Sequence, residues 1–334
     1  MADILNKEAF FLPEGVIYLD GNSLGPLPRA VPARVQAMMA DEWGEMLIRG
    51  WNKADWMAQP SRVGNMVARI IGAPDGSVVM GDTLSIKVFQ ALSSGLKLRK
   101  DRRVILSDNG NFPSDLYMAE GLVKLLEQGY ELRTVAPEEV MEAISEDVAV
   151  VMLTEVDYRT GRKHDMKTVT ELAQAKGAVM VWDLAHSAGA LPVDMTVSNA
   201  EFGHRQPFEF DLNYAPGNGI ERMRVGTPPV IQLTALEVAM ELWADVDMND
   251  LRAASIALQE QFIAEIERDV PALTLAVIDR GVIGDFRAPD IMRFGFTPLY
   301  IDSADVSAAV RVIADVMNNN LWDTDAYKVK SRVT

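Results

Sequence analysis

Continuous runs of apolar residues alternate with amphipathic helical patterns along the chain as far as Val193. Val104–Leu106, Val148–Thr154 and Val179–Trp182 are rich in β-forming residues, as is typical of strands buried on both faces of a parallel sheet. The segments between these runs carry apolar residues at helical spacing. Repeated strand–helix units of this kind predict an α/β fold with a mostly parallel, doubly wound sheet.

The pattern changes after Val193, and helical periodicity resumes only at Leu233. Two helices follow, the first from Leu233 and the second with Asn249 or Asp250 as its expected cap. Residues 281–300 then resemble two short strands around a polar loop, and Ser303 is expected to cap a last helix. We therefore expect a large domain over 51–232, and a smaller α+β domain formed by 1–50 together with 233–334.

Composition narrows the class of protein. The 334 residues are 49% hydrophobic, which is ample for two cores, and the formal net charge of −16 argues against nucleic acid and anionic membrane surfaces as partners. The absence of cysteine excludes disulfides and thiolate metal sites and fits a reducing cytoplasm. We find no signal peptide and no apolar run long enough to span a bilayer. We expect a cytoplasmic protein with a small-molecule partner and no metal.

Asp183 and His186 follow the apolar run Val179–Trp182, and small residues surround them. Ligands of parallel α/β sheets bind beyond the carboxyl ends of strands, where these two residues lie. A carboxylate there suits the protonated ring nitrogen of pyridoxal 5'-phosphate (PLP). The alternative is an aspartate that caps the next helix and a histidine satisfied in the core. These residues alone leave both interpretations open.

A candidate phosphate site lies between the expected strand Val78–Met80 and the helical run Ile86–Leu96. The connecting residues include Gly81 and Ser85. Free backbone N–H groups at a helix start, with nearby hydroxyls, bind an anion well. The spacing matches no named phosphate motif, so an ordinary helix cap is the alternative.

Several further side chains are candidates for a ligand site, each with a structural alternative. Phe112, with Asp115 at the mouth of the same helix, could stack on a cofactor ring or form a hydrophobic staple. Arg293 could bind a substrate carboxylate or form a surface ion pair. Asn22 lies in a glycine-rich loop and Trp51 in an aromatic segment, and both could line a pocket. We expect Lys163 and His164 to be solvated surface residues.

Six stretches of the chain carry a common pattern, namely YLDGNSLGPLP, NFPSD, VWDLAHSAGA, GHRQPFEFD, GIERMRVGTPP and GVIGDFRAPDIMRFGFTPLY. Together they resemble the kynureninase family, a family of fold-type I PLP-dependent hydrolases. The resemblance implies that Leu84, Ser85 and Thr227 bind the cofactor phosphate. It also implies that Phe112 and Asp115 form the ring pocket, that Asp183 pairs with the pyridine nitrogen beside His186, and that Arg293 holds the substrate carboxylate. The family's site is built from two subunits, so a homodimer is implied as well.

The chain departs from the family pattern at two places. The family carries a Thr-Tyr-Lys stretch downstream of the Asp-x-x-His strand, and its lysine forms the Schiff base with the cofactor. Here Ala200 is followed directly by Glu201, so a segment of a few tens of residues is absent, and a second gap lies near Leu275 and Ala276. The resemblance implies hydrolysis of L-kynurenine or 3-hydroxykynurenine to L-alanine and anthranilate or 3-hydroxyanthranilate, in tryptophan degradation. Without the lysine, an impaired enzyme, an inactive binder of PLP or kynurenine, or a shortened form of the enzyme are the alternatives.

Overall fold

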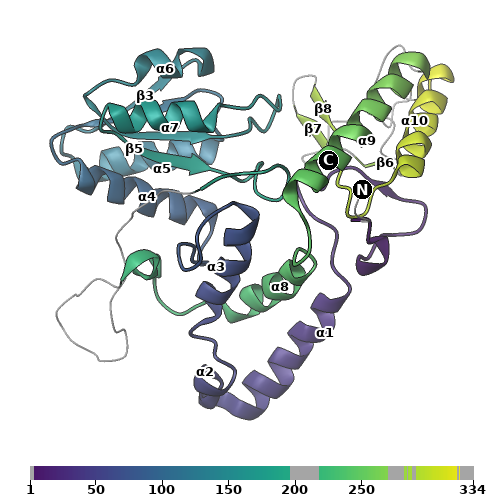
Figure 1. The fold of residues 1–334 in the computed structure, drawn as a ribbon, viewed down its shortest axis with the longest axis horizontal. Coiled ribbons are helices and arrows are strands. Elements are labelled where there is room, and N and C mark those ends of the chain that lie inside the picture. Colours follow the sequence, from purple (N-terminus) through teal and green to yellow (C-terminus); the bar gives the residue numbers. More distant parts are fainter. Residues whose placement is uncertain are drawn as a thin grey trace. The chain divides into compact units, whose positions relative to one another are not determined.

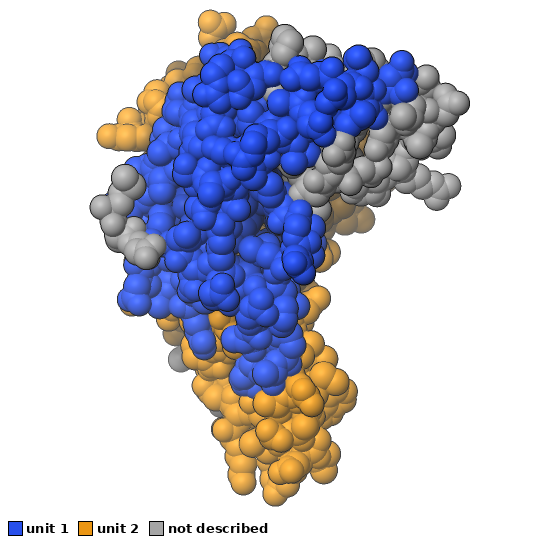
Figure 2. All heavy atoms as spheres, turned by 90° about the vertical axis from the view of Figure 1, so that its right-hand side faces the viewer, with its two compact units in different colours: residues 1–34, 189–192, 241–334 blue, residues 35–188, 193–240 orange. Residues whose placement is uncertain are grey.

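The structure is a computed structural model that describes residues 4–195, 218–269, 282–283, 285–287, 291–321 and 323. It divides into two compact units (Figure 2). Unit 1 comprises 1–34, 189–192 and 241–334, and unit 2 comprises 35–188 and 193–240. The domain limits expected from the sequence, 51–232 against the remainder, stay a prediction.

A four-stranded parallel sheet forms the centre of unit 2 (Figure 1). Its strands are β2 (Val104–Asp108), β3 (Glu131–Val135), β4 (Val148–Thr154) and β5 (Val179–Asp183), in the order β3-β2-β4-β5. All three neighbouring pairs are parallel. The predicted parallel α/β sheet is thereby confirmed.

Helices cover both faces of this sheet, as Figure 1 shows. On one face, α4 (Leu84–Leu98) and α5 (Pro113–Leu126) pack on inward side chains such as Ile105 and Met152. Gly95 lets α4 approach closely, because a Cβ there would lie 2.5 Å from the side chain of Val150. The opposite face is covered by α6 (Val140–Ala143) and α7 (Met166–Ala175), over a core that includes Leu106, Val151 and Leu153.

Strand β5 differs from the expectation of a fully buried strand. Val148–Thr154 is buried throughout, whereas Val179–Trp182 is half-buried. In the part of the chain that the structure describes, β5 pairs with β4 and with no other strand. A strand at the end of a sheet has one neighbour instead of two, which explains its partial exposure.

The rest of unit 2 is helical, and it corrects one predicted strand. Val78–Met80 forms no strand, since the N–H of Met80 donates to the carbonyl oxygen of Pro60 at 3.0 Å and the segment lies against α3. The helix expected over 29–49 is interrupted, with a π-helical stretch in its middle. The elements are η2 (Met38–Glu45), η3 (Leu47–Arg49), α2 (Gly50–Lys53), α3 (Gln59–Ile70), η5 (Gly219–Met223) and α8 (Val230–Glu241), whose last residue is assigned to unit 1. Helix α1 (Ala30–Ala37) begins in unit 1 and ends in unit 2.

Unit 1 packs two long helices beside two small sheets. Its helices α9 (Met248–Asp269) and α10 (Ser303–Asn318) bury a core with Phe262, Phe296 and Ile313. The remaining elements are η1 (Lys7–Ala9), β1 (Ile17–Tyr18), which pairs in parallel with β6 (Val282–Ile283), and β7 (Asp285–Arg287), which pairs antiparallel with β8 (Ile291–Arg293).

Both helix caps expected in unit 1 were wrong by a few residues. Asp302, not Ser303, caps α10, and its carboxylate accepts from the N–H groups of Ala304 and Asp305. Asp247 accepts from the N–H groups at the start of α9, where Asn249 or Asp250 was expected to be the cap. A carboxylate must precede the first turn to reach its free N–H groups, so the earlier acid has the better geometry.

The described helices include none that is long and apolar enough to cross a membrane.

Candidate functional site

The carboxyl ends of β4 and β5 bring Asp183 beside Thr154. One oxygen of Asp183, Oδ1, accepts from the N–H of Ala185 at 2.8 Å, and Oδ2 lies 3.0 Å from the hydroxyl of Thr154. Asp183 therefore stabilises the turn after β5, although no helix begins at this turn in the described residues, where the capping alternative expected one. Its second oxygen remains turned toward the neighbouring strand.

The hydroxyl of Thr154 has two acceptors for one proton. It lies 2.5 Å from Oδ1 of Asn111 as well as 3.0 Å from Asp183. A hydroxyl donates one hydrogen bond at a time. Oδ1 of Asn111 also receives the N–H of Phe112 at 2.7 Å, so Asp183 is the acceptor left short of a donor when Thr154 turns to Asn111.

Phe112 and Asp115 lie where α5 begins. Pro113, at the first position of the helix, fixes the backbone there. The ring of Phe112 is 39% exposed and meets Tyr158 edge-on, with ring centroids 4.9 Å apart. One face of Phe112 could thus support a planar ligand. Its N–H donates to Asn111, and Asn111 in turn accepts from Thr154 at the end of β4.

Asp115 is a fully buried carboxyl with an unsatisfied oxygen. Its Oδ2 has no hydrogen-bond partner among the described residues. Burial, together with the nearby charge of Asp183, raises the pKa of Asp115 to about 6. Neither acid has a basic partner within 4.0 Å in the described part of the chain. Two buried carboxyls without a basic partner, one of them with an unsatisfied oxygen, fit a cationic N–H group, which the protonated pyridine ring of PLP would supply.

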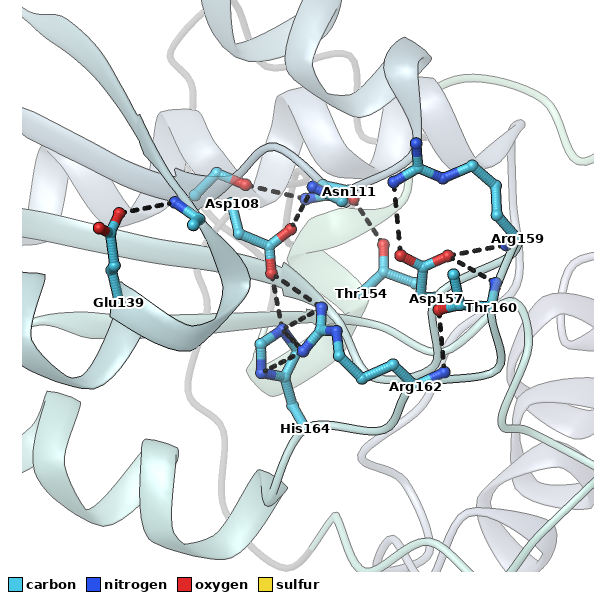
Figure 3. A network of polar contacts seen from close by, with 12 residues as sticks. Asp108, Asn111, Glu139, Thr154, Asp157, Arg159, Thr160, Arg162 and His164 are labelled. Carbon is cyan, nitrogen blue, oxygen red and sulfur yellow. Dashed lines mark hydrogen bonds and ion pairs between the residues drawn. The ribbon is translucent and has the colours of Figure 1, made fainter. Parts of the chain in front are cut away.

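A buried polar network surrounds this corner of the sheet (Figure 3). His164 is only 6% exposed, so its expected place on the solvated surface was wrong. Its Nε2 shares a hydrogen bond of 2.6 Å with Oδ2 of Asp108, and the guanidinium of Arg162 lies 3.2 to 3.4 Å from its two ring nitrogens. The network joins the loop after β4 to the turn after β2, and that turn leads to Phe112.

The expected phosphate site lies at the start of α4. Thr83 precedes the helix without a side-chain cap, so the capping alternative is not observed, and no described hydrogen bond uses the N–H groups of Leu84 and Ser85. Leu84 is exposed and Ser85 half-buried. Thr227 is exposed in the loop between η5 and α8. A helix start with open N–H groups can receive a phosphate.

The remaining candidates divide between the two units. In unit 2, His186 is half-buried in the turn after β5, and Trp51 packs edge-on against Trp56 at 5.4 Å. In unit 1, Asn22 is exposed, and Nη2 of Arg293 donates to the hydroxyl of Ser23 at 3.0 Å. The junctions at Ala200–Glu201 and Leu275–Ala276, and the stretch GHRQPFEFD, lie outside the described residues.

Sequence comparison decides the family. A kynureninase of Pseudomonas fluorescens is 42% identical over 397 residues, which cover 98% of this chain and 95% of the relative, and a kynureninase of Burkholderia pseudomallei is 38% identical with the same coverage. This chain belongs to the kynureninase family. Family models agree, since the kynureninase C-terminal domain matches residues 268–313 and aminotransferase class-V matches residues 17–204.

Comparison with solved structures gives the same fold class for this kynureninase-family chain. The cysteine desulfurase CsdA from Escherichia coli has a TM-score of 0.73 and 15% sequence identity, over 94% of this chain and 98% of its own. At that identity the likeness concerns the fold alone. The fold type expected from the sequence, that of the fold-type I PLP enzymes, is confirmed.

The length of the alignment can be compared with the two gaps expected from the sequence. The alignment with the Pseudomonas protein runs over 397 positions, whereas this chain has 334 residues, so at least 63 positions have no residue here. Two missing segments, one of a few tens of residues, agree with a difference of this size.

Four residues of the site were not predicted from the sequence, namely Asp108, Asn111, Thr154 and His164. For two of them, the position in the sequence could have indicated a place in the site. Thr154 ends the buried run of β4, and Asn111 follows β2, so both occupy the strand ends where ligands of such sheets bind.

Proposed function

We propose that this protein is a PLP-dependent hydrolase of the kynureninase type. Its substrate is L-kynurenine or 3-hydroxykynurenine, and its products are L-alanine and anthranilate or 3-hydroxyanthranilate. Membership of the kynureninase family over nearly the whole chain carries the proposal. The unsatisfied oxygen of buried Asp115 in α5, and buried Asp183 near it at the end of β5, support the choice of cofactor.

Five of the candidate residues have a specific role in this proposal. Ser85 and Thr227, with the N–H groups at the start of α4, hold the phosphate. Asp183 accepts from the ring nitrogen and keeps it protonated, while Phe112 stacks on the ring. Arg293 holds the carboxylate of the substrate through its two-pronged guanidinium. Bound PLP supplies an electron sink for negative charge that develops on the substrate.

A second candidate function follows from the missing lysine. The sequence contains no lysine between Lys176 and Lys328, where the family pattern places the covalent one. Covalent and acid–base contributions to catalysis are each large, so turnover without that lysine should fall by orders of magnitude. A protein that binds PLP or kynurenine but turns substrate over slowly or not at all is therefore the alternative.

Titration with PLP tests the cofactor site. We expect Asp183→Ala to raise the Kd for PLP about tenfold or more, because the ring nitrogen loses its charged partner. The exposed Asp101→Ala serves as a matched control and should bind as the wild type does. Unchanged affinity in Asp183→Ala would leave Asp183 with its turn-stabilising role alone.

Two assays distinguish the enzyme from the binder. Release of anthranilate from kynurenine, followed by its fluorescence, supports the hydrolase if it exceeds the rate with free PLP, and binding without release supports the alternative. Borohydride reduction of the PLP complex should leave no lysine adduct by mass spectrometry. A stable mass increment on one lysine would show that another lysine replaces the missing one.

We propose further that the chain forms a homodimer, as the family's two-subunit site implies. We also propose a cytoplasmic location, which the absence of cysteine supports. Light scattering after size exclusion tests the dimer, and a monomer at micromolar concentration would contradict it.

A further inference from the structure

Lys87 is a half-buried cation held between two segments of unit 2. Its Nζ donates to the carbonyl oxygen of Met223 at 3.0 Å and to Oε1 of Gln90 at 3.1 Å. The end of its side chain also lies against Gly81, where a Cβ would be 2.7 Å from Nζ. Gly81 precedes α4, so the side chain extends toward the N-terminal end of that helix, the usual direction for helical side chains.

The charge of Lys87 is not compensated by the residues around it. Both hydrogen-bond acceptors are neutral, and no described carboxylate lies within 4.0 Å of Nζ. Burial lowers the pKa of Lys87, and the charge of Asp82 opposes this only in part. An ammonium group has three donors, of which two are used here. A partly buried cation in this state is stabilised when an anion comes beside it.

The two segments that hold Lys87 are those of the proposed phosphate site. Leu84 and Ser85, with their open N–H groups, belong to the first turn of the helix that carries Lys87. Met223, which accepts from Nζ, ends η5 and leads into the loop with Thr227. The hydrogen bond from Lys87 to Met223 therefore ties the helix start to the Thr227 segment.

We propose that Lys87 binds the phosphate group of PLP and adds a full positive charge to the site formed by Leu84, Ser85 and Thr227. The inference rests on the proposed function, which places the phosphate there. Lys87 acts through its ammonium group and forms no covalent bond. In a chain without the family's covalent lysine, phosphate contacts supply a larger share of the affinity for the cofactor.

The test compares PLP with pyridoxal, which lacks the phosphate. Dissociation constants of both are measured for the wild type, Lys87→Met, Lys87→Arg and the control Lys97→Met, which removes an exposed lysine from the same helix. We expect Lys87→Met to weaken PLP binding roughly tenfold to a hundredfold, as for loss of a charge-assisted hydrogen bond, and to leave pyridoxal unaffected. Lys87→Arg should retain most of the affinity, and the control all of it.

Competition with inorganic phosphate provides a second measurement on the same variants. Phosphate should displace PLP from the wild type, and its inhibition constant should rise in Lys87→Met and stay close to the wild-type value in Lys87→Arg. Equal losses for PLP and pyridoxal, or no loss for either, would overturn the inference and leave the proposed function standing. A borohydride-trapped adduct on Lys87 would overturn the non-covalent role. A wild-type chain that binds no PLP would overturn both proposals.

Discussion

Replacing Asp115 by asparagine should make the cofactor-free protein more stable at neutral pH. The carboxyl is fully buried beside Asp183, and one of its oxygens has no partner among the described residues. Burial raises the pKa of Asp115 from 3.8 to about 6. In the folded protein the acid therefore stays protonated over a range of pH in which the unfolded chain has already released the proton.

The sign and size of the effect follow from this difference. Between pH 4 and pH 6 the folded state binds more protons than the unfolded state, so the free energy of unfolding falls as pH rises. The rise of the pKa from 3.8 to about 6 corresponds to about 3 kcal/mol, fully lost above pH 6. Asparagine carries no charge at any of these pH values and avoids the loss.

Urea unfolding of the cofactor-free protein at pH 4, 5, 6, 7 and 8 measures the difference. We expect Asp115→Asn and wild type to be close at pH 4 and to diverge until the variant is more stable by about 3 kcal/mol at pH 7. The exposed Asp101→Asn should follow the wild type throughout. If Asp115→Asn and wild type keep a constant difference from pH 4 to pH 8, the burial argument for Asp115 is refuted.

Three further changes test the described packing and polar contacts by urea unfolding. Thr154→Val removes the hydroxyl between Asn111 and Asp183 and should cost about 1–3 kcal/mol; a cost below this range would mean that water replaces the hydroxyl. Ile313→Ala opens the buried core of unit 1 and should cost about 2–5 kcal/mol, whereas a near-neutral result would contradict the burial of Ile313. Asp302→Ala removes the cap of α10 and should cost about 0.5–2 kcal/mol at pH 7. Because capping contacts and Lys7 lower the pKa of Asp302, this last cost should shrink as the pH falls below 4, and a cost that persists in acid would argue against the cap.

Strong local patterns made the sheet of unit 2 predictable. The run Val148–Thr154 is apolar enough to be recognised directly, and the structure forms β4 over the same residues. Strand β3, Glu131–Val135, gave no such signal because it lies at the end of the sheet and has polar residues at three of its five positions. Val78–Met80 has the composition of a strand, but strand formation requires a neighbour, and the segment lies against α3 instead.

Residues of the candidate site could be predicted where they belong to family motifs. Residues brought together by long-range contacts could not. The family resemblance supplied Phe112, Asp115 and Asp183 together with their expected roles, which stay predictions. The burial of His164 depends on Asp108, which lies 56 positions away in the chain, and no local pattern shows that contact. The orphaned oxygen of Asp115 is likewise a product of packing.

The position of β5 at the end of the described sheet should make its backbone amides exchange with solvent faster than those of β4. Within the described part of the chain, the outward-facing amides of β5 have no strand to bond, whereas those of β4 are shared between two neighbours. Deuterium should therefore enter the peptide Val179–Asp183 well before Val148–Thr154. Since Asp183 ends this strand, opening of β5 moves the carboxylate proposed to hold the cofactor ring, and added PLP should slow the exchange there first.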